Sequence, residues 1–397
     1  MKLQSSSRHN RILLAAFLWT LLAIASAIAA AQSEHPTLAI GASAPDFCLP
    51  GVDGQTHCLK DYASSKILVV AFICNHCPTS QLYETRIKQL AADYKDKGVA
   101  LVAIEPNNAD AVRLNEMGYT DVGDSFDEMK IRAVFRQFNF PYLYDGETQK
   151  VTTAYGPTAT PHIFIFDGER KLRYEGRIDN NTREPLVTVQ DARNALDALL
   201  AGKPVAVAKT PSIGCSTKWL YKEEGRRAEM AAIEKLPVNL KPVTADDLKA
   251  LRKNSTGKLL LIDFWATWCG PCRTELPTFE TMYRMYGHRA FDLVTVAINY
   301  PDEMPGVLKV LQDEHATNTN FGLASTDLYA QLAAFDPDWN AAVPYTVLIR
   351  PDGEIVYKVQ GGNVDPLKLK RLIIANLADD DYQGHSAYWK SAIDAQK

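Results

Sequence analysis

Two stretches of the chain decide the fold: Lys66–Cys77 (KILVVAFICNHC) and Lys258–Cys272 (KLLLIDFWATWCGPC). Each begins with an apolar run of the kind that forms a central strand covered on both faces. Each run leads within a few residues to two cysteines three positions apart, and a segment with helical spacing follows. The chain therefore contains the order strand, cysteine pair, helix twice.

The segments downstream of the two cysteine pairs also share one order. A second apolar strand follows, at Val99–Ile104 and at Phe291–Ile298, and later an X-Pro bond, at Pro161 and at Pro344, precedes a hairpin and a closing helix. Parallel crossovers with a terminal hairpin give a central mixed sheet flanked by helices. This is the thioredoxin arrangement, so we predict an α/β protein of two tandem thioredoxin-like folds.

Length and local composition set the predicted boundaries. We expect a signal peptide at residues 1–31, a first domain at 37–202, a linker with a helix at 203–237 and a second domain at 238–385. The first residues combine basic positions, an uncharged apolar run from Ile12 to about Ile24 and then small residues, which is the layout of a secretory signal. The protein is therefore predicted to be periplasmic or otherwise extracytoplasmic, with membrane contact only if the signal segment stays uncleaved.

The charge of the chain argues against nucleic acid as a partner. The formal net charge is −4, and cleavage after residue 31 would remove three basic residues and no acidic ones, leaving −7. The sequence has no basic stripe of the kind that neutralises phosphate backbones.

The chain has seven cysteines, and an odd number leaves at least one thiol without an intramolecular partner. Disulfides persist in exported proteins. Cys48 and Cys58 flank a turn at residues 52–54, so a hairpin would bring them together, and we predict a structural disulfide between them.

The CGPC pair has the chemistry of a dithiol that exchanges with other disulfides. One helical turn places the sulfurs of Cys269 and Cys272 on the same face, within bridging reach. The helix amino terminus favours a thiolate at Cys269, so we expect Cys269 to attack a substrate disulfide and Cys272 to resolve the mixed disulfide. A zinc site would need two more ligands nearby, and a haem attachment would need histidine where Arg273 stands. We therefore expect no cofactor here beyond the redox-active disulfide.

The surroundings of CGPC resemble a known active site. Ile262–Pro277 (IDFWATWCGPCRTELP) closely resembles the thioredoxin active-site segment, and the second half as a whole is similar to exported reductases of the TlpA/ResA type. The resemblance implies that Asp263 is a buried proton acceptor for Cys272 and that Pro344 is the cis-proline that presents the preceding backbone to a substrate peptide. Thioredoxin is a reductant, so we expect this half to reduce protein disulfides with electrons from a membrane donor.

The first half resembles the peroxiredoxin-like redoxin family of the thioredoxin superfamily. The matching motifs are GASAPDF, FICNHCP, YGPTATP and, at residues 214–219, GCSTKW. The resemblance implies that Cys74 corresponds to the first cysteine of the thioredoxin pair. Cys74 and Cys77 are then predicted to form a second dithiol, with Pro161 in the place that Pro344 has in the second half.

Two neighbours of this predicted dithiol have open roles. A charged His76 would stabilise a thiolate beside it and make the disulfide more oxidising, whereas a solvent-facing His76 would tune nothing. Cys215, in the GCSTKW tail, is either a third redox thiol or an inert one.

Two other functions stay open for CNHC. Cys74 could reduce peroxide and be recycled by CGPC, although the peroxidase motif P-x-x-x-[ST]-x-x-C is absent before it. Cys74 and Cys77, either alone or with His162 as a third ligand, could instead hold copper(I), which soft thiolates suit. An electron relay from CGPC to CNHC within one chain is a further hypothesis.

Overall fold

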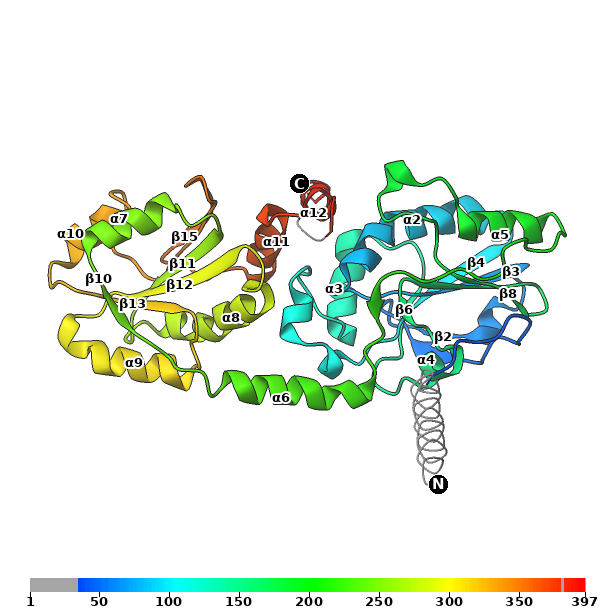
Figure 1. Ribbon diagram of the computed structural model, residues 1–397, viewed down its shortest axis with the longest axis horizontal. Coiled ribbons are helices and arrows are strands. Elements are labelled where there is room, and N and C mark those ends of the chain that lie inside the picture. The colour runs from blue at the N-terminus through cyan, green and yellow to red at the C-terminus, as the bar shows by residue number, and fades with distance from the viewer. Residues whose placement is uncertain (1–34, 380–381, 397) are drawn as a thin grey trace, which may run out of the picture.

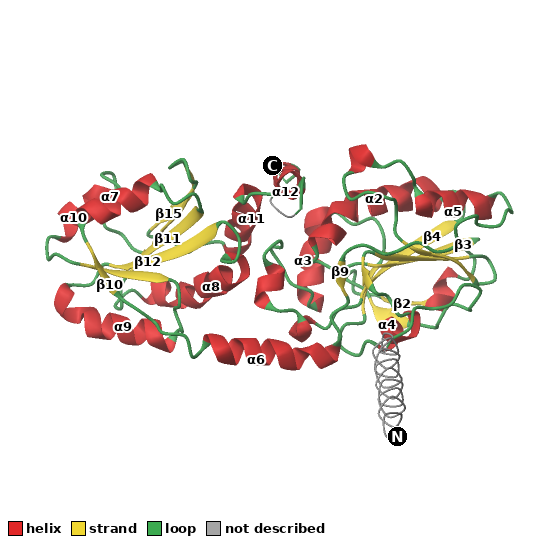
Figure 2. Ribbon diagram, viewed as in Figure 1, coloured by secondary structure: helices red, strands yellow, loops and turns green. Residues whose placement is uncertain are grey.

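The computed structural model describes residues 35–379 and 382–396, so the predicted signal peptide lies outside the described residues. In the described ranges, no helix combines the length and the apolarity that crossing a bilayer requires. The chain forms two α/β units, and helix α6 (Glu223–Ile233) runs between them (Figure 1). Both units have the predicted mixed sheet flanked by helices (Figure 2).

The first unit is built on a five-stranded sheet. In spatial order its strands are β5 (Tyr142–Tyr144), β4 (Val99–Glu105), β3 (Ile67–Phe72), β7 (His162–Phe166) and β8 (Leu172–Gly176). The central strand β3 is buried along its whole length because its alternate side chains enter two cores, Val69 and Ala71 on one face and Val70 and Phe72 on the other. The helices that cover the sheet are α2 (Pro78–Lys95), α3 (Phe126–Arg136), α4 (Lys150–Tyr155) and α5 (Asp191–Leu200).

The second unit repeats this plan with one more strand. In spatial order its strands are β10 (Lys241–Val243), β13 (Thr319–Leu323), β12 (Phe291–Ala297), β11 (Leu259–Trp265), β14 (Tyr345–Ile349) and β15 (Ile355–Gln360). β11 is the counterpart of β3, and it too divides its side chains between two cores. The helices are α7 (Ala245–Lys253), α8 (Gly270–Tyr286), α9 (Met304–Asp313), α10 (Leu328–Phe335) and α11 (Pro366–Asn376).

The predicted hairpin near the start of the first unit is confirmed. β1 (Cys48–Pro50) pairs antiparallel with β2 (Thr56–Cys58), and Cys48 lies opposite Cys58. The two cysteines form a disulfide, as predicted.

The linker differs from the prediction of residues 203–237. The backbone of Thr210 bonds that of Glu175, and β9 (Cys215–Ser216) pairs antiparallel with β6 (Ala159–Thr160) of the first unit. Residues up to 219 therefore belong to the first unit, and the connection consists of the stretch that contains α6. The polar composition of the segment concealed this, because β9 and β6 form a separate sheet of two short strands that the sequence does not mark.

Helix α12 (His385–Asp394), which follows the second unit, packs against the first unit. It extends beyond the predicted domain end and lies against α2. Trp389 is fully buried, and His385 Nε2 lies 2.7 Å from Gln81 Oε1. Nearby, Arg371 Nε donates to Asp121 Oδ2 over 2.7 Å.

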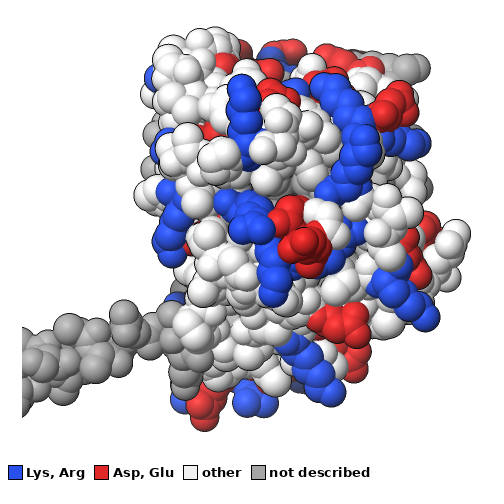
Figure 3. Space-filling view, turned by 90° about the vertical axis from the view of Figure 1, so that its right-hand side faces the viewer, with Lys and Arg blue, Asp and Glu red and all other residues white. Residues whose placement is uncertain are grey.

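The far end of the first unit carries a mixed surface. On the face drawn in Figure 3, acidic and basic side chains are interspersed, and no continuous basic stripe crosses it.

Candidate redox sites

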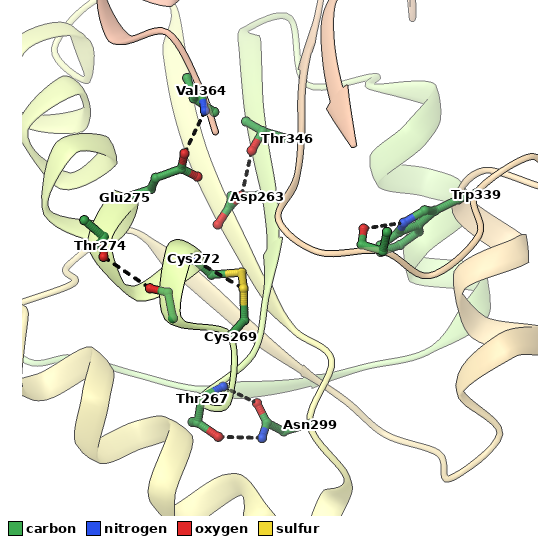
Figure 4. The surroundings of a disulfide bond; sticks show 12 residues. Asp263, Thr267, Cys269, Cys272, Thr274, Glu275, Asn299, Trp339, Thr346 and Val364 are labelled. Carbon is green, nitrogen blue, oxygen red and sulfur yellow. Dashed lines mark hydrogen bonds between the residues drawn. A yellow bond between two sulfur atoms is a disulfide. The ribbon is translucent and has the colours of Figure 1, made fainter. Parts of the chain in front are cut away.

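The CGPC pair lies at the amino end of α8, as the sequence predicts. Cys269 is the N-cap residue, and its sulfur accepts the Cys272 N–H over 3.3 Å. The two sulfurs are bonded to each other, so the structure holds the oxidised form (Figure 4). Cys272 is fully buried and Cys269 is 6 % exposed, whereas the neighbouring Trp268 is 64 % exposed. Cys269 is therefore the sulfur at the surface, beside a large aromatic side chain.

Asp263 is buried in β11, between Thr346 and the disulfide in Figure 4. Its Oδ1 accepts from the Thr346 hydroxyl over 2.8 Å, and its Oδ2 has no hydrogen-bond partner among the described residues. Burial, with a smaller contribution from the charge of Glu275, raises the pKa of Asp263 to about 7, although the Thr346 bond opposes the rise. A carboxyl group with such a pKa can take up and release a proton near neutral pH.

The residue before cis-Pro344 has an unpaired backbone among the described residues. The Val343–Pro344 bond is cis, and within the described part of the chain Val343 makes no backbone hydrogen bond. The loop before Cys269 is held by Asn299, which accepts the Thr267 N–H over 3.0 Å and donates to the Thr267 hydroxyl over 2.8 Å. An extended peptide could pair with Val343, as strand addition to a sheet edge requires.

Strand register corrects the alignment of the two cysteine pairs. Phe72 lies opposite His162 and Phe264 lies opposite Tyr345, and each partner directly follows a cis-proline. Cys269 stands five residues after Phe264, and the residue five after Phe72 is Cys77.

Helix capping gives the same result. Cys77 is the N-cap of α2, and its sulfur accepts the Ser80 N–H over 3.4 Å, as Cys269 does from Cys272. The expectation that Cys74 corresponds to the first thioredoxin cysteine is therefore wrong. Cys77 has that place and Ser80 has the place of Cys272. The C-x-x-C pattern suggested the wrong alignment because the first cysteine of the pair follows the strand by three residues fewer in the first half than in the second.

The thiols of Cys74 and Cys77 are free in this structure. The sulfur of Cys74 lies 3.0 Å from Thr160 Oγ1, and that of Cys77 lies 3.2 Å from the Thr160 carbonyl oxygen. The N–H of Cys215 donates to the Cys77 sulfur over 3.3 Å. Cys215 thus reaches the CNHC site, which the sequence left open.

The three thiols differ in acidity. Burial opposes ionisation of Cys77, but hydrogen bonds from the Cys215 and Cys74 thiols and the charge of His76 outweigh it and hold the pKa of Cys77 well below its usual value. Burial and the bond to Cys77 raise the pKa of Cys74 well above its usual value. The bond to Cys77, with burial, also raises the pKa of Cys215. Among the three thiols, Cys77 therefore has the helix-capping position and the lowered pKa that favour a thiolate nucleophile.

His76 is buried and does not face solvent. Its Nδ1 lies 2.5 Å from Asp124 Oδ2, and the same carboxylate accepts the N–H groups of Asn75 and His76 and the amide of Asn107. Burial lowers the pKa of His76, but the charge of Asp124 outweighs it, so the net pKa is raised. This favours an imidazolium beside the Cys77 thiolate, in agreement with a tuning role.

The cluster of Cys74, His76 and Asp124 fits a metal poorly. Ligand atoms of Cys74, His76 and Asp124 lie within 4.8 Å of one another. The Asp124 oxygens, however, are already engaged by four internal donors, and a hard carboxylate does not suit copper(I). His162 is no ligand, because its Nε2 pairs with Glu175 over 2.7 Å and its Nδ1 accepts the Thr158 N–H.

Sequence reasoning missed three residues of this site. Asp124 follows the cysteines by almost fifty residues, in a loop without a motif, and Thr160 carries no signal besides preceding a proline. Ser80 could have been found, because Cys77 and Ser80 have the same spacing as a C-x-x-C pair and Pro78 between them marks the first turn of a helix.

Similarity to known proteins agrees with this architecture. Residues 40–175 and 235–358 each match the AhpC/TSA family. Thiol-disulfide oxidoreductase ResA of Oceanobacillus iheyensis is 30% identical over 105 residues, which are 26% of this chain and 50% of that protein. ResA of Bacillus subtilis is 28% identical over 123 residues, which are 31% of this chain and 60% of that protein. The chain thus spans roughly half the length of these relatives.

A solved structure, described as an uncharacterized conserved protein from Geobacillus kaustophilus, is 41% identical with a TM-score of 0.42, and the match covers 47% of this chain and 94% of that one. The two AhpC/TSA matches fall one in each α/β unit and together span more than half of the chain. The chain therefore belongs to the AhpC/TSA family.

Proposed function

We propose that the protein is an exported thiol–disulfide oxidoreductase whose second unit reduces disulfides of protein substrates. The main support for this proposal is the geometry of the CGPC centre: Cys269 caps α8 near the surface and is bonded to the buried Cys272. The exposed Trp268 and the unpaired backbone of Val343 support a peptide as the substrate.

The exchange follows from the placement of these groups. In the reduced protein the Cys269 thiolate attacks one sulfur of the substrate disulfide, so a mixed disulfide forms and the first substrate thiolate leaves. Asp263 accepts the proton of the Cys272 thiol, and the resulting thiolate attacks the Cys269 sulfur. The second substrate thiolate then leaves, and two electrons have passed to the substrate. The protein ends in the oxidised form of Figure 4, and a donor, which we propose is membrane-bound, restores the dithiol.

A direct relay between the two centres does not fit this arrangement. The carboxyl end of α8 touches the first unit, where the Tyr286 hydroxyl donates to the Thr120 carbonyl over 2.7 Å. CGPC is at the other end of this helix of 17 residues, about 25 Å away at 1.5 Å per residue. We therefore propose that CGPC serves external substrates, and that transfer to the first unit needs a rearrangement or a second molecule.

The test is to trap the mixed disulfide in the exported fraction of cells. A Cys272→Ser protein should accumulate disulfide-linked partners on Cys269, whereas a Cys269→Ser/Cys272→Ser protein should accumulate none there. Equal adducts in both proteins would contradict the proposed role of Cys269.

Peroxide reduction and copper binding remain alternatives for the first unit. Counted from Cys77, the peroxidase motif still lacks its threonine and proline, because Cys74 and Val70 occupy those positions. Peroxide consumption by a reduced Cys269→Ser/Cys272→Ser protein would favour the first alternative. An anaerobic copper(I) titration that loses one equivalent on Cys74→Ser would favour the second.

A further inference from the structure

Residues 214–219 (GCSTKW) occupy, in the first unit, the place that a substrate peptide would take in the second. Thr160 precedes cis-Pro161 as Val343 precedes cis-Pro344. Thr160 pairs with Cys215 in an antiparallel bridge, whereas Val343 has no such partner among the described residues. In the first unit, Cys215 of the same chain therefore pairs with the backbone of Thr160, at the position where a substrate cysteine would bind in the second unit.

The 214–219 segment is held by specific contacts. Gly214 has a φ of +156°, and a Cβ atom there would lie 1.8 Å from the Thr160 carbonyl oxygen, so only glycine allows this approach. Beyond it, the Thr217 hydroxyl donates to the Pro157 carbonyl over 2.7 Å, and the Lys218 N–H donates to Asn107 Oδ1 over 2.8 Å. The position of Cys215 is thus built into the fold.

The segment also brings Cys215 to the nucleophile. The Cys215 N–H donates to the Cys77 sulfur over 3.3 Å. Cys74 contacts Cys77 as well, but its backbone N–H is bound to Ser80 Oγ and its sulfur lies 3.0 Å from Thr160 Oγ1. Of the two neighbours, Cys215 has the relation to Cys77 that a peptide cysteine has in a mixed disulfide.

We propose that Cys77 and Cys215 form the redox disulfide of the first unit, with the 214–219 segment as its built-in peptide. Cys77 is fully buried, so the segment lifts to admit an incoming disulfide, R–S–S–R′. The Cys77 thiolate attacks one sulfur and R′S⁻ leaves. Cys215 then returns, gives up its proton to R′S⁻, attacks the Cys77 sulfur and expels RS⁻. Two electrons have passed from two cysteines to the substrate, and a Cys77–Cys215 disulfide remains.

This inference rests on the proposed thiol–disulfide exchange but uses none of the CGPC residues, so the two can fail separately. The full chain carrying Cys269→Ser/Cys272→Ser is reduced, treated with oxidised glutathione, quenched in acid and mapped by peptide mass spectrometry. We expect Cys77–Cys215 to exceed Cys74–Cys77 by about tenfold, which is about 30 mV for a two-electron couple. A product dominated by Cys74–Cys77, or a stable glutathione adduct on Cys77, would overturn the proposal.

Three further variants, made in the same background, keep the test decisive. Cys215→Ser should leave glutathione on Cys77 or divert the product to Cys74–Cys77, whereas Cys74→Ser should leave the Cys77–Cys215 bond unchanged. Gly214→Ala should reduce its yield, because the added methyl group displaces the segment. Circular dichroism of each variant confirms folding, and Cys269 adducts in a Cys272→Ser/Cys77→Ser protein report the proposed activity of CGPC independently.

Discussion

Replacing Asp263 by asparagine tests the buried acid beside the CGPC disulfide. Moving a carboxyl pKa from 3.8 to about 7 corresponds to about 4 kcal/mol, at about 1.4 kcal/mol for each tenfold change in the acid constant. The pKa of Asp263 is higher in the folded protein than in the unfolded chain, so Asp263 of the unfolded chain loses its proton first as the pH increases. This ionisation stabilises the unfolded chain relative to the folded protein. The folded protein should therefore lose stability between pH 4 and pH 7, and the loss should be complete by pH 8.

An asparagine at this position removes the titration. We expect the oxidised Asp263→Asn protein to match the wild type near pH 4 and to exceed it at pH 8 by up to about 4 kcal/mol in free energy of unfolding. The measurement is urea unfolding followed by tryptophan fluorescence, to which the buried Trp265 and Trp339 of the second unit contribute. Asp302→Asn, at an exposed aspartate, is the matched control. A difference between variant and wild type that stays constant from pH 4 to pH 8 would refute the reasoning.

Three other measurements bear on the two sites and on the interface. In a reduced Cys269→Ser/Cys272→Ser protein, the ultraviolet absorbance of a thiolate should persist at neutral pH, and adding Cys77→Ser should abolish it. Adding His76→Asn instead should shift the appearance of this absorbance to higher pH, because the imidazolium that stabilises the Cys77 thiolate is gone. Trp268→Ala should lower kcat/KM for protein disulfides by about tenfold, as loss of an exposed aromatic anchor does, and should spare a small disulfide such as oxidised glutathione. Trp389→Ala should cost about 3 kcal/mol in urea unfolding, because it opens a cavity between the two units.

The elements that the sequence predicted well are those with a strong local signal. β3 and β11 are continuous apolar runs because both faces are covered, and the Cys48–Cys58 hairpin has local turn chemistry. The cis form of Pro344 was expected from the resemblance to thioredoxin. At CGPC, the N-cap position of Cys269 and the burial of Asp263 likewise agree with expectation.

The parts that the sequence did not reveal depend on contacts between distant segments. Nothing in the spacing of CNHC shows that Cys77, and not Cys74, caps the helix, because that follows from strand register. Asp124 reaches His76 across a loop, and β9 is too short to carry a periodic signal. The acidity of a buried thiol depends on just such neighbours, so its assignment needed the structure.

The position of α12 has a consequence for the order in which the protein matures. Glu84 and Arg132 of the first unit form a buried ion pair, and Tyr388 and Trp389 of α12 cover it from some 250 residues or more downstream. These covering residues follow the whole first unit in the chain, whereas domains generally fold as units from the amino end. When the first unit folds, this polar cluster is therefore still uncovered, and the cover is complete only after α12 has been made and has docked.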